Sequence, residues 1–231
     1  MEPRKYERTY HFPFSPGQTG DDKVQPDYWQ HISKMERIVM TEKMDGENNC
    51  LNRYGVFARS HAAPTVSPWS ARLRERWAQI HNDLGELEIF GENLYAVHSI
   101  EYTRLEDYFF VFAARFSDRW LGWEEVCFYA NALDLPVVPV LNISEPPGSE
   151  QVFRKIVIDF SGAESQLGSI DANTGVKCSR EGIVLRDFNA FPAGDMSTHV
   201  LKYVRKDHVQ TSEHWTRNWR PAKLINHYRS R

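Results

Sequence analysis

The alternation of apolar and polar positions predicts several short strands along this chain. Residues 36–42 form an apolar stretch that predicts a strand ending at Lys43. Residues 48–52 and 55–60 predict two short strands joined by a turn. Strand-like patterning recurs in four later segments, at 86–92, 108–116, 177–187 and 199–206.

Helical periodicity is clearest between residues 68 and 84. Ser67 is placed to cap this helix and Pro68 suits its first turn. Five apolar or aromatic residues fall on one face of it, namely Trp69, Leu73, Trp77, Ile80 and Leu84. Shorter helices are predicted at 123–133 and at 149–160, the second capped by Ser149.

Strands that alternate irregularly with isolated helices predict an α+β fold with a largely antiparallel sheet rather than a βαβ repeat. We expect one domain over residues 1–231. Its first 30 residues are rich in Pro, Gly and aromatics and predict a structured loop segment. Residues 207–231 predict a basic tail or helix.

The composition suits a chain with a full hydrophobic core. Of 231 residues, 41% are hydrophobic, and the longest apolar runs, such as 108–114, are too short to span a bilayer. The start is charged and lacks the apolar region of a secretory signal. Cys50, Cys127 and Cys178 have neither a zinc-binding spacing nor a disulfide pattern, so we expect reduced thiols and a cytoplasmic protein without a membrane partner.

The net charge of −3 conceals a basic C-terminal segment. Residues 202–231 carry eight Lys or Arg against two acids, and Trp215 and Trp219 lie among them. Basic residues with interleaved aromatics can neutralise phosphates and stack on bases. The alternative is a solvated terminal helix whose tryptophans dock on the core.

Lys43 begins the sequence KMDGE, which suits a lysine that attacks a nucleotide phosphate. The alternative is an ordinary hairpin turn at Asp45 and Gly46. A lysine nucleophile must be neutral, so nearby positive charge, a metal ion or burial must lower its pKa. Expulsion of pyrophosphate also needs cationic groups. Partners for these tasks, and an aromatic for the base, lie in or at the ends of predicted strands, namely Arg59, Glu92, Phe112, Glu181 and Lys202.

Six short motifs in this order resemble those of the covalent nucleotidyltransferase superfamily, which contains polynucleotide ligases and mRNA capping enzymes. They are KMDGE (43–47), ARSH (58–61), IFGEN (89–93), FFVF (109–112), EGIVLR (181–186) and LKYVR (201–205). The resemblance implies an ATP-grasp-like ligase adenylation domain, with largely antiparallel sheets flanking a nucleotide cleft.

The resemblance also implies a role for each motif residue. Lys43, Lys202 and Glu181 would be catalytic, with Lys43 carrying AMP and Lys202 contacting the α-phosphate. The nucleotide would be bound by Glu42, Lys43, Arg59, Glu92, Phe112, Val184 and Lys202. Mg²⁺ or Mn²⁺ would be held by Glu92, Glu181 and Asp45. Ala113 and Ala114 follow Phe112 where this motif usually has an acid, which leaves Phe110 as an alternative stacking residue.

Within the superfamily, FGEN followed by LYAVHSIEY, and EGIVLR leading to LKYVRKDH, resemble the RNA ligase 2-like branch. This implies ATP-dependent joining of RNA 3′-hydroxyl and 5′-phosphate ends, with an end-healing kinase or phosphatase as a possible partner. RNA would be contacted by Arg205, Lys206, Arg217 and Arg220. The 26 residues after Arg205 are too few for an OB domain, which favours this branch over capping enzymes and DNA ligases.

Three alternatives stay open at this stage: a minimal DNA ligase, a capping guanylyltransferase, and a catalytically silent protein that binds nucleic-acid ends. His61 and His98 are expected to be surface or hydrogen-bonded groups rather than metal ligands. Asp21 and Asp22 lie in the Pro/Gly-rich loop, where they could approach a metal or nucleic acid or form a surface turn.

Overall fold

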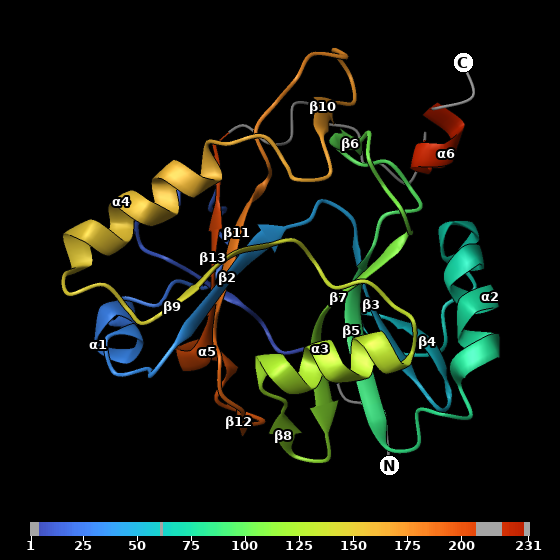
Figure 1. The fold of residues 1–231 in the computed structure, drawn as a ribbon, viewed down its shortest axis with the longest axis horizontal. Coiled ribbons are helices and arrows are strands. Elements are labelled where there is room, and N and C mark those ends of the chain that lie inside the picture. The colour runs from blue at the N-terminus through green and yellow to red at the C-terminus, as the bar shows by residue number, and fades with distance from the viewer. Residues whose placement is uncertain (1–4, 61, 207–218, 229–231) are drawn as a thin grey trace.

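The computed structural model describes residues 5–60, 62–206 and 219–228. Its described strands form two larger sheets and one small one (Figure 1). The five-stranded sheet has the order β1 (Tyr10–His11), β13 (Val200–Val204), β11 (Gly182–Asp187), β2 (Ile38–Lys43) and β9 (Val140–Ser144). The six-stranded sheet has the order β12 (Phe191–Pro192), β8 (Arg119–Trp120), β7 (Phe109–Phe116), β5 (Leu87–Asn93), β3 (Glu47–Asn52) and β4 (Gly55–Ala58).

The pairing of these strands confirms the predicted α+β class. A third, two-stranded sheet joins β6 (Ile100–Tyr102) to β10 (Ser169–Asp171). Among the described strands, β1 and β13 pair in parallel and all other neighbours are antiparallel. No OB barrel is present in the part of the chain that the structure describes.

The helices lie around the outside of the two larger sheets (Figure 1). On the side of the five-stranded sheet are α1 (Tyr28–Ile32) and α4 (Glu150–Ser161). On the side of the six-stranded sheet are α2 (Ala71–Ile80) and α3 (Trp123–Ala132). Shorter helical turns complete the described chain, namely a 3₁₀ turn at Pro68–Ser70, α5 (Met196–His199) and α6 (Ile225–Tyr228).

The helices predicted at 123–133 and 149–160 agree with α3 and α4 to within one residue at each end, whereas the helix predicted at 68–84 has different bounds in the structure. Ser149 caps α4 as predicted, because its Oγ accepts a hydrogen bond from Val152 N at 3.3 Å. The helix predicted at 68–84 is instead a 3₁₀ turn followed by α2, which ends at Ile80, and Ser67 makes no side-chain cap. Leu84 remains buried, but Gly85 adopts a left-handed conformation that turns the chain into β5.

One strand prediction and one loop prediction also need correction. The strand predicted at 177–187 begins only at Gly182, because the backbone of Cys178 and Arg180 donates to Ser169 O and Ala163 O instead. The N-terminal segment predicted as a loop contributes β1, and α1 follows from Tyr28. A strand of two residues is too short to show periodicity, so no sequence pattern predicts it.

The five-stranded sheet separates an apolar face from a polar one because successive side chains alternate. One face packs against α4 and the N-terminal segment through Met40, Ile183, Leu185, Leu201, Phe12, Tyr28 and Phe153. Thr41 and Lys43 lie on the opposite face, which β11 and β13 extend through Val184 and Lys202. This second face is turned toward the six-stranded sheet.

Residues Met44–Gly46 carry the chain from β2 in one large sheet to β3 in the other. Because β2 and β3 are not paired with each other, Asp45 and Gly46 do not form a hairpin turn. The KMDGE sequence therefore lies at the junction of the two sheets, where a site between them would form.

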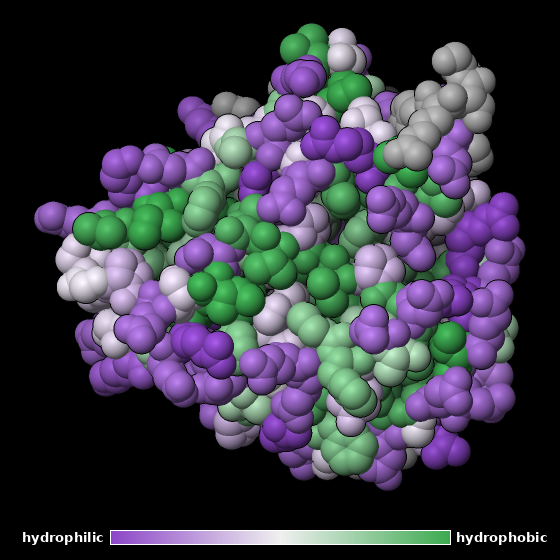
Figure 2. Space-filling view, viewed as in Figure 1, coloured by the Kyte–Doolittle hydropathy of each residue, from purple (hydrophilic) through white to green (hydrophobic). Residues whose placement is uncertain are grey.

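An apolar surface lies over α4 and β9 in Figure 2. Ile143 on β9 and Val152 and Ile158 on α4 are each roughly half-exposed. Strand β9 forms one edge of its sheet and pairs only with β2 among the described strands.

None of the helices described is long and apolar enough to cross a bilayer.

Glu42 lies on the apolar face of the five-stranded sheet, so its side chain points away from Lys43. Its carboxylate accepts hydrogen bonds from Ser165 Oγ and Gln166 N, each at 2.6 Å. Arg180 Nη1 is 3.5 Å from the same carboxylate, and both side chains of this ion pair are almost fully buried. The network ties β2 to the segment that follows α4.

We expect Glu42→Ala to lower the free energy of unfolding by about 3–5 kcal/mol, because it leaves Arg180 buried without its carboxylate. Urea unfolding followed by tryptophan fluorescence measures this. The control is Glu124→Ala, which removes an exposed carboxylate 3.9 Å from Arg37 and should cost at most about 0.5 kcal/mol. Unchanged stability with lost nucleotide binding would instead assign the Glu42 side chain to the nucleotide.

Candidate active site

A cavity of about 670 Å³ lies between the two large sheets. That volume is within the usual range for a small-molecule site. One part of its lining is charged or polar and includes Lys43, Glu47, Asn48, Arg59, Glu92 and Lys202. Another part is mostly apolar and includes Tyr6, Phe112, Ala113, Trp120, Val184 and Met196. A ligand with a planar apolar group and a charged group would match this division.

Lys43 ends β2 and carries the central charge of the site. Its Nζ lies 2.8 Å from Glu181 Oε2, and the Glu181 side chain is only 6% exposed. The contact follows from strand register, because Gly182, the next residue, pairs directly with Lys43. Burial alone would lower the pKa of Lys43, but the carboxylates of Glu181 and Glu92 outweigh it and hold the pKa above its ordinary value.

Glu92 reaches the same site from β5 in the other sheet. Its Oε1 accepts a hydrogen bond from Gly46 N at 3.1 Å. Gly46 fits closely there, because a Cβ would lie 2.6 Å from the carbonyl oxygen of Asn93. Burial raises the pKa of Glu92 to about 8, with Glu181 adding to the shift and Lys43 opposing it. A group with this environment binds a cation readily once ionised.

Asp45 is held from several directions. Its Oδ2 accepts hydrogen bonds from Ser99 N and Ile100 N, both at 2.8 Å, and its own N donates to the Tyr102 hydroxyl. Burial, with the charge of Glu181, raises the pKa of Asp45 to about 7. One carboxylate oxygen is therefore occupied by backbone amides, so the predicted metal contact would fall to Oδ1.

Phe112 faces the cavity because β7 is irregular at this point. Phe90 pairs with Ala113 while the next residue, Gly91, pairs with Val111, so Phe112 has no partner across the sheet. Such a bulge redirects a side chain. Phe110 is buried in the core instead, and the alternative stacking position therefore lies outside the cavity lining.

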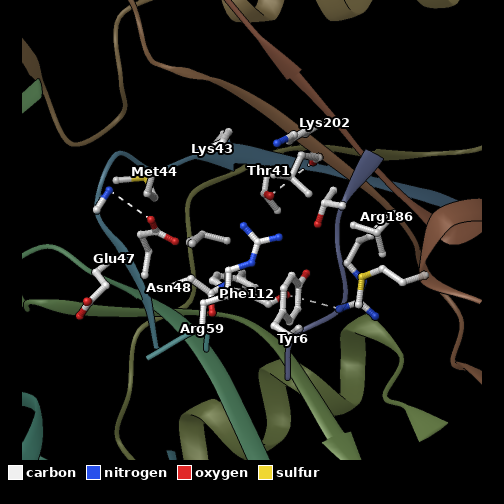
Figure 3. Close-up of a pocket in the computed structure, with 18 of the residues that line it drawn as sticks. Tyr6, Thr41, Lys43, Met44, Glu47, Asn48, Arg59, Phe112, Arg186 and Lys202 are labelled. Carbon is white, nitrogen blue, oxygen red and sulfur yellow. Dashed lines mark hydrogen bonds between the residues drawn. The ribbon is translucent and has the colours of Figure 1, made fainter. Parts of the chain in front are cut away.

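The remaining predicted nucleotide contacts converge on the cavity. Figure 3 shows the Arg59 guanidinium reaching into it from the residue after β4. Val184 and Lys202 are neighbours across β11 and β13. Glu42 is also among the lining residues, but its side chain is engaged on the far side of the sheet, which leaves its backbone to face the cavity.

Several lining residues were not predicted as site residues from the sequence, among them Tyr6, Thr9 and Glu47. Tyr6 packs against Phe112, Phe90 and Trp120, with ring centroids 5.3 Å apart in each case, and Thr9 follows it along the cavity wall. Glu47 accepts hydrogen bonds from Trp69 Nε1 and Ser70 Oγ. Tyr6 and Thr9 belong to the irregular N-terminal segment, which carries no periodic signal. Glu47 belongs to KMDGE itself and could have been found there.

The donor set fits Mg²⁺ or Mn²⁺ only in combination with a ligand. Among the described residues, no group of three His, Cys, Asp or Glu side chains is arranged to hold a metal unaided. Mg²⁺ is commonly bound by one or two carboxylates together with substrate phosphates and water. Glu92 and Glu181, which flank Lys43, match that requirement.

Of the residues predicted to bind RNA, the structure describes Arg205, Lys206 and Arg220. Lys206 is exposed, and Arg205 Nε donates to the Arg180 carbonyl oxygen. Arg220 contacts Glu101 at 2.5 Å, in a segment where Trp219 packs against Trp69 and Tyr95. Arg217 and Trp215 lie outside the described residues, as does His61. His98 is buried, with Nδ1 3.9 Å from Asp45.

The family model described as RNA ligase matches residues 36–204. No curated protein matches the sequence. An archaeal ATP-dependent RNA ligase has a similar structure, with a TM-score of 0.55 and 18% identity over 88% of this chain and 48% of its own. The RNA ligase of Naegleria gruberi with PPi has a TM-score of 0.54 and 18% identity, over 88% of this chain and 60% of its own.

A mutant of the Naegleria gruberi enzyme with ATP and Mn gives a TM-score of 0.54 at 18% identity, over 88% of this chain and 61% of its own. This chain thus spans about half to three-fifths of the length of the solved structures that it resembles. At this level of identity the likeness shows a shared fold. The family model covers most of the chain, and its match to residues 36–204 shows that the chain belongs to the RNA ligase family.

Proposed function

We propose that this protein is an ATP-dependent RNA ligase that joins 3′-hydroxyl and 5′-phosphate ends through AMP bound to Lys43. The observation that carries the proposal is the contact of Lys43 with Glu181 in a cavity that also presents Glu92, Arg59 and Lys202. Phosphoryl transfer depends mainly on positioning and charge neutralisation, and this cluster provides both.

In the first step Lys43 Nζ attacks the α-phosphorus of ATP. A nitrogen–phosphorus bond forms, the bond to the bridging oxygen breaks, and pyrophosphate leaves. Arg59 and Lys202 supply positive charge for the phosphates, while Phe112 and Val184 offer apolar surfaces to the adenine. The ammonium of Lys43 must lose a proton before it attacks.

The carboxylates around Lys43 set when that proton can leave. In the free protein they favour the charged ammonium and raise its pKa. A divalent cation bound at Glu92 and Glu181 would offset the charge of these carboxylates and neutralise the phosphates. The pKa of Lys43 would then fall, because the carboxylates would no longer stabilise its ammonium form. Lys43 would thus become a nucleophile when the nucleotide and the cation are both in place.

Two further transfers complete the proposed reaction. A 5′-phosphate oxygen attacks the phosphorus of the AMP on Lys43, which breaks the nitrogen–phosphorus bond and gives an adenylylated RNA end. The 3′-hydroxyl then attacks the 5′-phosphate, loses its proton and releases AMP. RNA breaks that lack a 3′-hydroxyl or a 5′-phosphate would first need a kinase or phosphatase to restore these groups. We propose this role for an end-healing partner.

We expect the protein to become labelled when it is incubated with α-³²P-ATP and Mg²⁺ or Mn²⁺ and then denatured. Lys43→Ala should abolish the label because it removes the nitrogen that bonds to phosphorus. Lys34→Ala, which changes an exposed lysine, should label like the wild type. Labelling by GTP alone would indicate a capping enzyme, and no adduct with any nucleotide would sink the proposed chemistry.

We expect nicked duplexes with RNA at the 3′-hydroxyl side to be sealed faster than all-DNA nicks. The measurement compares the rate of sealing on two substrates that differ only in the sugars of the strand ending at the nick. Since the 2′-hydroxyl distinguishes RNA from DNA at one position, the comparison isolates recognition of that end. Equal rates on both substrates would favour a minimal DNA ligase.

A further inference from the structure

The N-terminal loop places Asp22 against Lys202, the lysine that the proposed function assigns to the α-phosphate. Asp22 Oδ1 lies 3.3 Å from Lys202 Nζ and 3.2 Å from His11 Nε2. Both Asp22 and Lys202 are mostly shielded from solvent, with side chains 26% and 19% exposed. At this depth, water screens a contact between opposite charges less than it does at the surface.

The second oxygen of Asp22 is also engaged. Asp22 Oδ2 accepts hydrogen bonds from Thr19 N and Thr19 Oγ1, both at 3.0 Å, while Asp22 N donates to Thr19 O. This turn fixes the carboxylate so that Oδ1 faces Lys202. The neighbouring Asp21 is in the same loop, but its contact among the described residues is made by its backbone carbonyl, which accepts from Arg8.

The loop is fastened to the strand that carries Lys202. His11 in β1 pairs in parallel with Lys202 in β13, and Phe12 N donates to the Lys202 carbonyl at 3.0 Å. Beyond them, Val204 N donates to Ser15 Oγ at 2.9 Å and Gly17 N donates to the Val204 carbonyl. The loop therefore moves with β13, and Asp22 keeps its place relative to Lys202.

Gly17 and His11 fix the loop further. A Cβ on Gly17 would lie 2.6 Å from the Arg205 carbonyl oxygen, so the close approach there requires glycine. His11 is buried between Ser15 Oγ, 2.9 Å from its Nδ1, and Asp22. Burial and the charge of Lys202 lower the pKa of His11 to about 4, so it is neutral near pH 7. Asp22 is thus the charged partner of Lys202 in this contact.

Lys202 needs such a partner because Lys43 serves the same cavity. Burial and the charge of Lys43 both lower the pKa of Lys202, and Asp22 opposes that shift. A lysine that binds phosphate must stay charged and must point at it. Without Asp22, repulsion from Lys43 would favour neutral or displaced forms of Lys202.

We propose that Asp22 is a positioning residue that holds Lys202 in the orientation needed for the α-phosphate of bound ATP. The assignment rests on the proposed function, because it gives Lys202 its phosphate role. Asp22 itself touches no reacting atom. It acts through Lys202, and the N-terminal loop is thereby a part of the active site.

The test is the single-turnover rate of adduct formation with labelled ATP in the full chain. Asp22→Asn keeps oxygen and nitrogen atoms for the Thr19 turn and removes the charge, and we expect the rate to fall about tenfold, as small misplacements of catalytic groups do. Asp21→Asn is the matched control and should react like the wild type. Melting temperatures establish that each variant is folded.

The effect must also depend on Lys202. In a Lys202→Ala background, Asp22→Asn should slow the reaction no further, whereas a purely structural role would slow both backgrounds equally. Thr19→Val removes one hydrogen bond to the Asp22 carboxylate and should slow the reaction about threefold. This variant replaces Asp22→Asn in the test if Asp22→Asn does not fold.

The outcomes separate the two proposals. Two results would overturn the role of Asp22 while the wild type still forms the adduct. One is an unchanged or faster rate in Asp22→Asn, and the other is equal slowing by Asp22→Asn in the wild-type and Lys202→Ala backgrounds. If Asp22→Asn does not fold, an unchanged rate of adduct formation in Thr19→Val would likewise overturn the role of Asp22. No adduct in the wild type would overturn the proposed function and the role of Asp22 with it.

Discussion

The site depends on the register of β2, β11 and β13. Lys43, Gly182 and Val204 form one row across these strands, and Thr41, Val184 and Lys202 form the row two residues along, on the same face of the sheet. Strands β11 and β13 approach closely at Gly182 because this residue has no side chain: a Cβ there would lie 1.9 Å from the Tyr203 carbonyl oxygen. A slip of one residue would exchange the two faces of a strand. This pairing therefore holds both lysines on the cavity side and brings Glu181 beside Lys43.

The charges in the cavity are balanced for a ligand that is itself charged. Three carboxylates surround Lys43, and their environment raises the pKa of Asp45 to about 7 and of Glu92 to about 8. Burial disfavours the ionised form of each, and each disfavours the charge of the other. A cation would relieve both effects and loosen the hold on the Lys43 proton. The same groups would then bind the metal and control the nucleophile, a coupling that a lone lysine could not provide.

Much of the fold and site was predictable because strand ends and short motifs leave local signals. The strands that carry Lys43, Glu92 and Lys202 follow their apolar patterns, and all three residues line one cavity. Other features depend on long-range contacts that no local pattern encodes. The bulge that turns Phe112 toward the cavity is a property of the pairing of β5 with β7. The resemblance implied that Glu42 binds the nucleotide; Glu42 does line the cavity, but the alternation of the strand turns its carboxylate to the opposite face, where it binds Ser165 and Gln166. Tyr6 and Asp22 belong to an irregular segment, which long-range contacts hold in place: Tyr6 packs against Phe90, Phe112 and Trp120, and β1 pairs with β13.

The proposed reaction depends on the transfer of AMP to Lys43. The most direct measurement is peptide mass spectrometry of the protein after incubation with ATP and Mg²⁺, without RNA, to locate the modified residue. A phosphoramidate is labile in acid, so digestion must be performed at neutral or alkaline pH. We expect one AMP on the peptide that contains Lys43, and we expect it to be lost as ATP when pyrophosphate is added before digestion, because the first step is reversible. AMP on any other residue, or a modification that pyrophosphate does not reverse, would contradict this proposal.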